Sequence, residues 1–336
     1  MREPMPMPVT GAGATHTSPQ RGGPAPTPDR HPRPARRNLR GRQHGLVAAA
    51  FLLPALVVYV TFVIYPALQS VNISFFDWTG PGRPAQFIGM DNYRELLTDS
   101  AFFAAIRHNI VVIVVSVLFQ LPLGMGMALI ITSKIRARRF WRAVYFLPML
   151  MSTVAIGILW SYIFNPSFGL VNGFLGAIGL ESLQQGWLGQ SSTALGAVMV
   201  TTIWQFAPFY MIIDSAAIVA VPLQLYEAAR LDGAGPIRQL FSITLPMLKP
   251  VIVTTVLLSV IGSIKFFDLV YVMTGGGPNG STELLATYMF RQGFLSFRFG
   301  YASAIASAML VFSLIAMLVV LARSFTQRPR LGRAKR

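Results

Sequence analysis

The sequence contains no cysteine and few charged residues. The absence of cysteine excludes disulfide bonds and thiol chemistry. Charged residues make up only 12% of the 336 residues, whereas soluble domains contain roughly a quarter. Hydrophobic residues make up 53%. This composition is typical of a protein whose outer surface faces lipid, and it argues against a soluble fold.

Several functional motifs are also missing. The sequence has no Gly-x-x-x-x-Gly-Lys-Ser/Thr phosphate loop, so the chain is not expected to bind and hydrolyse ATP itself. Its four histidines are scattered, and three of them lie in the first 45 residues, which argues against a metal site. No pairing of a nucleophile with a base stands out. We therefore predict no catalytic residue, no bound metal and no cofactor held by this chain.

The apolar residues gather in six long runs without the alternation expected of strands, which favours helices over a barrel. Each run is long enough to cross about 30 Å of hydrocarbon at about 1.5 Å per residue. The sequence therefore predicts an all-α integral membrane protein. The six expected spans are Leu46–Pro66, Asn109–Thr132, Ala143–Phe164, Ala194–Val219, Pro250–Met273 and Tyr301–Ala322.

The basic residues indicate the orientation of these spans. Of the 28 Lys and Arg, 22 fall in the two tails, the loop after the second span and the loop between the fourth and fifth spans. Basic residues concentrate on the cytoplasmic side of membrane proteins, so both termini are expected in the cytoplasm. Membrane topology thus accounts for the formal charge of +16, and no nucleic-acid partner is predicted.

Four regions follow from this organisation. We expect a disordered, basic, Pro-rich cytoplasmic tail over residues 1–45, because it has almost no apolar residues to bury. The other regions are a first transmembrane helix with its outer loop (46–104), a transmembrane core (105–322) containing a cytoplasmic loop at 221–250, and a basic cytoplasmic tail (323–336).

The loop at 221–250 reads as two short helices joined by a hinge. Pro222 and Pro236 each suit the first turn of a helix. The run Asp232-Gly233-Ala234-Gly235 provides the break, because glycine takes a positive φ at little cost. One face of the first helix needs a partner protein or lipid headgroups to bury it. That face comprises Leu223, Tyr226, Ala229 and Arg230.

This loop resembles the signature of ABC-importer permeases. Glu227-Ala228-Ala229, Gly233, Ile243 and Leu245-Pro246 match all seven fixed positions of the signature at its fixed spacing. The resemblance implies a coupling helix that docks into a groove of a cytoplasmic ATPase. The implied coupling residues are Glu227, Ala228, Ala229, Asp232 and Gly233.

Further motifs resemble the carbohydrate-uptake branch of that family, the maltose and glycerol-phosphate type. They include Phe87–Tyr93, Tyr145–Pro148, Asn165-Pro166 and Thr274–Pro278, and the match extends from about residue 46 to 322. The last of these is similar to the first of the two permeases that such systems use. The resemblance implies a type I ABC-importer permease fold and a multi-pass protein of the bacterial cytoplasmic (inner) membrane.

The implied assembly pairs this chain with a second six-helix permease subunit in the lipid bilayer. An ABC ATPase dimer would use ATP-Mg on the cytoplasmic side, and an extracytoplasmic sugar-binding protein would deliver the sugar. The sequence does not indicate which sugar this is.

Charged and aromatic residues in the spans are candidates for the substrate path. Lys265 and Asp268 lie three residues apart, so they could form an ion pair on one helix. Alternatively, Asp268 could bind sugar hydroxyls, while Asp214 is interpreted as structural or as a link to the loop. Sugars also stack on aromatic rings. The substrate-path candidates are Asp268, Phe267, Lys265, Trp160, Trp204 and Tyr210.

Two other classes of function compete with this interpretation. A self-contained secondary transporter or channel predicts inverted internal repeats, and none is evident. An intramembrane enzyme needs catalytic groups at matched depth, but Asp214 and Asp268 are expected at opposite ends of their spans. Neither alternative explains the cytoplasmic loop.

Overall fold

The computed structural model of the chain describes residues 50–82, 85–133 and 135–326, with side chains described up to residue 322. Contacts divide the chain into two units, residues 1–57 and 58–336. The described part of the first unit, residues 50–57, is helical. The tail predicted at 1–45 lies outside the described residues, as do residues 327–336 of the C-terminal tail.

The described residues contain five helices long and apolar enough to cross a membrane, and a sixth if one bent pair counts as a single span. The helix predicted at Ala194–Val219 has those bounds. The five helices are Ala50–Ile73, Ser100–Thr132, Ala194–Val219, Pro236–Ile264 and Phe299–Ala322.

Three of these spans contain a five-residue π-helical turn that ends two residues before a proline. The turns are η1 (Val60–Ile64), η2 (Ser116–Gln120) and η4 (Leu240–Thr244). The prolines are the second residues of α2 (Tyr65–Ile73), α5 (Leu121–Thr132) and α12 (Leu245–Ile264). Proline lacks an N–H and clashes with the carbonyl four residues earlier, and a wider turn relieves that clash. Each of these helices therefore continues through its proline without a break, because the preceding turn is wider.

The third predicted span, Ala143–Phe164, is wrong as a single straight helix. It consists of α6 (Arg138–Leu150) and α7 (Thr153–Ile163), which are bent by 96° at the break between them. Met151 and Ser152 are extended at that break. Pro148 cannot donate its backbone hydrogen bond, which weakens the last turn of α6.

The fifth predicted span, Pro250–Met273, is displaced toward the N-terminus. It begins with α11 (Pro236–Gln239) and ends with α12 at Ile264, and a separate short helix follows, α13 (Asp268–Thr274). Asp268 stands in the first turn of α13, where a carboxylate interacts favourably with the positive end of the helix dipole. The second span begins at Ser100, nine residues earlier than predicted, with α4 (Ser100–Val115).

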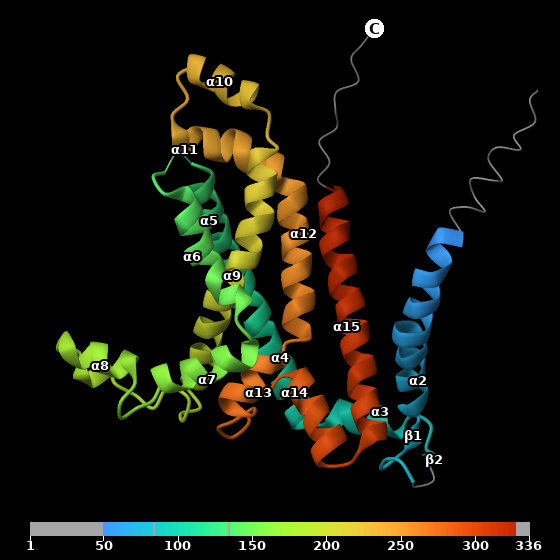
Figure 1. Cartoon of the computed structure of the whole chain (residues 1–336). Coiled ribbons are helices and arrows are strands. Elements are labelled where there is room, and N and C mark those ends of the chain that lie inside the picture. Colours follow the sequence, from blue (N-terminus) through green and yellow to red (C-terminus); the bar gives the residue numbers. More distant parts are fainter. Residues whose placement is uncertain (1–49, 83–84, 134, 327–336) are drawn as a thin grey trace, which may run out of the picture. The chain divides into compact units, whose positions relative to one another are not determined.

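The connections lie at the two ends of the long helices (Figure 1). At one end, α10 (Leu223–Leu231) and α11 form a helical hairpin. Strands β1 (Phe76–Asp77) and β2 (Gln86–Phe87), which pair antiparallel, lie at the other end. The remaining elements at that other end are α3 (Asp91–Thr98), α8 (Leu170–Ala177), η3 (Glu181–Leu183), α13, α14 (Leu285–Phe290) and η5 (Arg291–Leu295).

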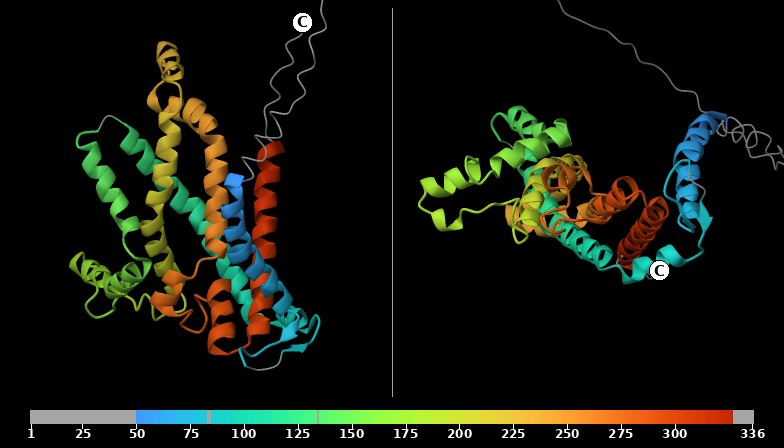
Figure 2. Two further views of the ribbon diagram at one scale, coloured as in Figure 1. Left: turned by 45° about the vertical axis from the view of Figure 1, so that its right-hand side comes forward. Right: turned by 90° about the horizontal axis from the view of Figure 1, so that it is seen from below.

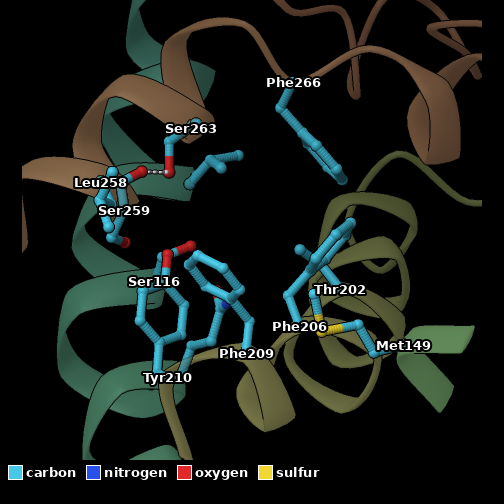
Figure 3. Close-up of a pocket in the computed structure, with 13 residues that line it drawn as sticks. Ser116, Met149, Thr202, Phe206, Phe209, Tyr210, Leu258, Ser259, Ser263 and Phe266 are labelled. Carbon is cyan, nitrogen blue, oxygen red and sulfur yellow. Dashed lines mark hydrogen bonds between the residues drawn. The ribbon is translucent and has the colours of Figure 1, made fainter. Parts of the chain in front are cut away.

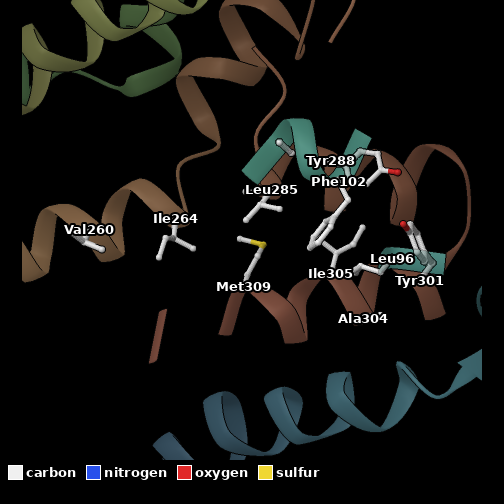
Figure 4. Packing of buried hydrophobic residues seen from close by; sticks show 12 residues of the cluster. Leu96, Phe102, Val260, Ile264, Leu285, Tyr288, Tyr301, Ala304, Ile305 and Met309 are labelled. Atoms are coloured by element: carbon white, nitrogen blue, oxygen red, sulfur yellow. The ribbon is translucent and has the colours of Figure 1, made fainter. Parts of the chain in front are cut away.

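Helix α9 (Ala194–Val219) packs against α5, α6 and α12, and α12 packs in turn against α15 (Phe299–Thr326; Figure 2). A buried apolar cluster joins α4, α12, α14 and α15, with Phe102, Leu285, Tyr301 and Ile305 among its members (Figure 4). Many other apolar side chains of the long helices are exposed, as expected of surfaces that face lipid or other subunits.

Asp99 fastens α14 and α15 to the beginning of α4. Its carboxylate accepts hydrogen bonds from the hydroxyls of Tyr288 and Tyr301 and caps α4 through the Ala101 N–H. Burial raises the pKa of the Asp99 carboxyl, but these hydrogen bonds lower it by more, and its pKa lies below the ordinary value of 3.8. Burial and the neighbouring Asp99 raise the pKa of Tyr288 to about 12. Arg298 pairs with Glu95 beside this cluster at 2.5 Å.

Asp99→Asn is expected to lower the stability of the detergent-solubilised protein by about 1–2 kcal/mol at pH 7, because the tyrosines lose a charged acceptor at a partly exposed site. A group with a depressed folded pKa stabilises above its unfolded pKa, and the contribution is lost as pH falls through the folded value. The difference between wild type and Asp99→Asn should therefore shrink as the pH falls below about 4, the ordinary pKa of an aspartate, and vanish below the depressed folded pKa. Thermal unfolding across pH measures this, and a difference that persists in acid would contradict the assignment. Glu95→Gln, at an exposed ion pair, should cost less.

Candidate functional site

The loop between α9 and α11 forms the predicted pair of helices. Pro222 is the N-cap residue of α10, one position before the first turn where it was predicted, and Pro236 is the first residue of α11. Between the helices Gly233 takes φ +76°. Its N–H bonds to the Arg230 carbonyl at 3.0 Å, and the Ala234 N–H bonds to the Ala229 carbonyl at 2.8 Å. The backbone therefore turns sharply at the end of α10.

The hairpin is held to the rest of the chain by few contacts. The Tyr226 hydroxyl lies 3.0 Å from the Thr244 hydroxyl of η4 and joins the hairpin to the next helix. Within the hairpin, the Gln239 side chain donates to the Ala234 carbonyl at 2.7 Å. Tyr226 and Ala229 are half-buried, whereas Leu223 and Arg230 are exposed. The prediction that these four residues share a face open to a partner is therefore wrong in part, because Tyr226 turns inward.

The predicted coupling residues come together on the outside of this hairpin. Four of them, Glu227, Ala228, Asp232 and Gly233, are exposed, and Ala229 is half-buried. Within the described residues, Glu227 and Asp232 form no ion pair.

Large apolar side chains accompany these residues on the same hairpin. Leu231 is 90% exposed and Ile237 is 74% exposed. Phe241, in η4, is also exposed. An apolar surface next to unpaired acidic groups, at the end of the long helices, is suited to bind another protein.

A cavity of about 320 Å³ lies among α4, η2, α9 and α12 (Figure 3). Its size falls within the range of small-molecule sites, roughly 300–1,000 Å³. Its wall is mostly apolar and includes four aromatic rings and a few polar side chains. The aromatic residues are Phe206, Phe209, Tyr210 and Phe266, and the polar residues are Ser116, Gln120, Thr202, Ser259 and Ser263. Rings beside hydroxyls are the arrangement that binds sugars, through stacking and hydrogen bonds.

Of the six predicted path residues, Tyr210 lines this cavity. Trp160 and Trp204 pack edge to face against each other, with ring centroids 5.5 Å apart. Phe267 stacks on Tyr271 at 5.1 Å, directly after the cavity residue Phe266.

Lys265 and Asp268 are not on one helix, because α12 ends at Ile264 and α13 begins at Asp268. Both side chains are exposed, and among the described residues they form no ion pair. The interpretation as an ion pair within a single span is therefore wrong. Asp214 is buried on α9, in a part of the helix that does not line the cavity.

Sequence reasoning missed the polar residues that line the cavity. Ser259 and Ser263 lie four residues apart on α12, and the Ser263 hydroxyl bonds to the Ser259 carbonyl at 2.8 Å. Because serine can satisfy its hydroxyl within its own helix, serines in a span give little sign of a cavity. A run of small residues on one face of an apolar helix, here Ser259, Gly262 and Ser263, is the signal that was present.

Comparison with known proteins agrees with this geometry. Residues 120–328 match the family described as "Binding-protein-dependent transport system inner membrane component". A probable ABC transporter permease of Bacillus subtilis is 38% identical over 81% of this chain and 94% of its own length. A diacetylchitobiose uptake system permease of Streptomyces coelicolor is 34% identical over 88% of this chain and 90% of its own length.

A solved structure has the same fold. One chain of a bacterial ABC transporter involved in the import of the acidic polysaccharide alginate superposes with a TM-score of 0.75, at 25% identity, over 86% of this chain and 98% of that one. These relatives are permease subunits and not enzymes. The chain therefore belongs to the family of binding-protein-dependent transport system inner membrane components, and it is a permease subunit of an ABC transporter.

Proposed function

We propose that this chain forms half of the transmembrane pathway of an importer for a sugar or sugar derivative, and that the α10–α11 hairpin couples this pathway to an ATPase. One observation carries the proposal: the residues that match the permease signature converge on an exposed hairpin at the end of the long helices. Two similar proteins belong to systems that take up diacetylchitobiose and alginate, which supports a carbohydrate as the substrate.

The assembly follows from this proposal. A second six-helix permease completes the pathway, an ABC ATPase dimer hydrolyses ATP-Mg, and a sugar-binding protein delivers the solute. The bent pair α6–α7 counts as one span, which makes six. Both termini and the hairpin then lie on the cytoplasmic side of a bacterial inner membrane, in agreement with the basic residues of the loops.

Coupling proceeds through the hairpin. When ATP closes the ATPase dimer, the two docking grooves move and carry the hairpins with them. The hairpin is continuous with α9 and, through α11 and η4, with α12, and both α9 and α12 line the cavity. A displacement of the hairpin therefore reaches two walls of the cavity directly, as alternating access requires.

Tyr210 supplies the test of the cavity as a sugar site. Tyr210→Ala removes a ring from the cavity wall, and a lost stacking contact is worth about 0.5–1.5 kcal/mol, which corresponds to an increase of about two- to tenfold in the KM of uptake. Tyr210→Phe keeps the ring and should have a smaller effect. Uptake of radiolabelled sugar by the whole complex measures both. Phe119→Ala, at an exposed aromatic residue of η2 outside the cavity, is the control, and equal effects at both sites would remove Tyr210 from the path.

Co-purification tests the assembly. The full chain, tagged at its C-terminus, is isolated from its native membranes in mild detergent and its partners are identified by mass spectrometry. The proposal expects an ATPase with a phosphate loop, in two copies per two permeases, and a second six-span permease. A chain that purifies alone and still moves diacetylchitobiose or alginate oligosaccharide into vesicles would instead be a secondary transporter.

A further inference from the structure

Asn109 joins two helix ends that are far apart in the sequence. It lies on α4, in the membrane-spanning part of the chain, and is 3% exposed. Its side-chain N–H donates to the Ser263 carbonyl at 2.8 Å, and its side-chain oxygen accepts from the Leu285 N–H at 2.8 Å. Ser263 lies in the last turn of α12, and Leu285 is the first residue of α14.

The Leu285 N–H has no partner in its own helix, and the Ser263 carbonyl otherwise accepts a long bond from the Phe266 N–H, at 3.4 Å. The last carbonyls and the first N–H groups of a helix have no intrahelical partner, and within a membrane-spanning region water does not replace one. A primary amide is the side-chain group that donates and accepts at once in this geometry. An aspartate at this position keeps the acceptor for Leu285 but loses the donor for Ser263.

The neighbouring residue makes a third bond to the same region. The buried His108 Nδ1 lies 2.9 Å from the Glu283 carbonyl and donates to it. Two successive residues of α4 thus hold residues 263 and 285, which flank the segment Lys265–Leu284, and residue 283 near its end. This segment leaves α12 at one end and enters α14 at the other, and both ends are attached to α4.

The segment also forms part of the cavity. Phe266, its second residue, lines the cavity together with Ser263 (Figure 3). Further along, α13 packs against α7, the second half of the bent span. The segment therefore bridges α4 and α7, and its attachment to α4 determines where Phe266 stands relative to Val112 and Ser116, the cavity residues of α4 and η2.

We propose that Asn109 is a positioning residue, which holds Lys265–Leu284 to α4 as one unit and thereby keeps Phe266 in the wall of the cavity. When both hydrogen bonds are absent, the segment separates from α4 and the half-buried Phe266 becomes more accessible to water. The consequence for transport rests on the proposed function of the cavity, whereas the position of Phe266 does not.

The absence of cysteine from the chain permits a direct test. In the full complex in membrane vesicles, Phe266→Cys is the single thiol of this subunit. A small, charged methanethiosulfonate reagent labels it at a rate that follows its access to water. The rate is compared among chains with Asn109 intact and with Asn109→Leu, Asn109→Asp and Asn109→Gln.

We expect Asn109→Leu to raise the labelling rate of Phe266→Cys by about tenfold or more, because two hydrogen bonds that hold the segment are lost. Asn109→Asp should give an intermediate rate. Asn109→Gln, which retains donor and acceptor, should restore most of the protection, and a merely volume-filling role would not predict that rescue. Asn72→Leu, at an exposed asparagine of α2, should have no effect.

A second thiol separates local from global change. Leu183→Cys, at an exposed residue of η3 outside the cavity and the hairpin, should be labelled at the wild-type rate in every background. Equal labelling of Phe266→Cys in wild type, Asn109→Leu and Asn109→Asp, with Leu183→Cys unchanged, would overturn the proposal. If Asn109→Leu does not accumulate in the membrane, the test is the comparison of Asn109→Asp with Asn109→Gln, and equal labelling rates of Phe266→Cys in these two would overturn the proposal. The complex could move no sugar while the labelling rate of Phe266→Cys still depends on the residue at position 109 as expected. That result would refute the proposed function and leave this inference standing.

Discussion

Gly233→Val is expected to separate the permease from its ATPase. Gly233 has φ +76°, a backbone region that a β-branched residue occupies at a cost of about 1–3 kcal/mol. The turn that ends α10 must then open, and the hairpin no longer presents Glu227 and Leu231 in the same relation to α11. Docking into a preformed groove tolerates little change of shape, so we expect co-purification of the ATPase to fall about tenfold or more.

Gly235 provides the matched control for this change. It lies two residues away and is also exposed, but its φ is −69°. A Cβ at either glycine would meet no atom within 4 Å, so the two positions differ in backbone conformation and not in available space. Gly235→Val should retain the ATPase, while the second permease should remain with both variants. Equal retention of the ATPase by the two valine variants would contradict the coupling role of the turn.

Gly124→Leu is expected to have the largest effect on folding. Gly124 lies where α5 crosses α9, and a Cβ there would stand 2.8 Å from the Tyr210 Cβ and 2.9 Å from the Ala207 carbonyl oxygen. Small residues allow such close approach of helices in membranes. A leucine would force the helices apart, at a cost of about 3 kcal/mol or more. We expect a large loss of folded protein in the membrane and a markedly lower melting temperature in detergent.

Gly126 tests whether close contact, and not helix propensity, is responsible. It lies two residues further along α5, and a Cβ there would meet no atom within 4 Å. Gly126→Leu gains helix propensity to the same extent as Gly124→Leu, so it should leave stability unchanged or raise it slightly. Similar melting temperatures for the two leucine variants would show that α5 and α9 are not as close as described here.

Local signals in the sequence sufficed for several parts of the fold. The span Ala194–Val219 is predominantly apolar between polar ends, and hydrophobic length alone gives its bounds. The hairpin at 221–250 is specified by proline and glycine, whose backbone limits act within a few residues. The match of its residues to a permease signature led to the family directly. These features depend on neighbours in the chain, so the sequence alone determined them.

The tertiary structure decided where the helices break and where the cavity lies. Residues 151–152 and 265–267 lie inside apolar runs, where hydropathy predicts continuous helices. They are broken because α7 and α13 pack against each other and because Asn109 binds the helix ends at Ser263 and Leu285. Asn109 is separated by 154 and 176 residues from its two partners. A backbone group released from a helix in a membrane needs a partner, and only the folded chain determines which distant side chain supplies it.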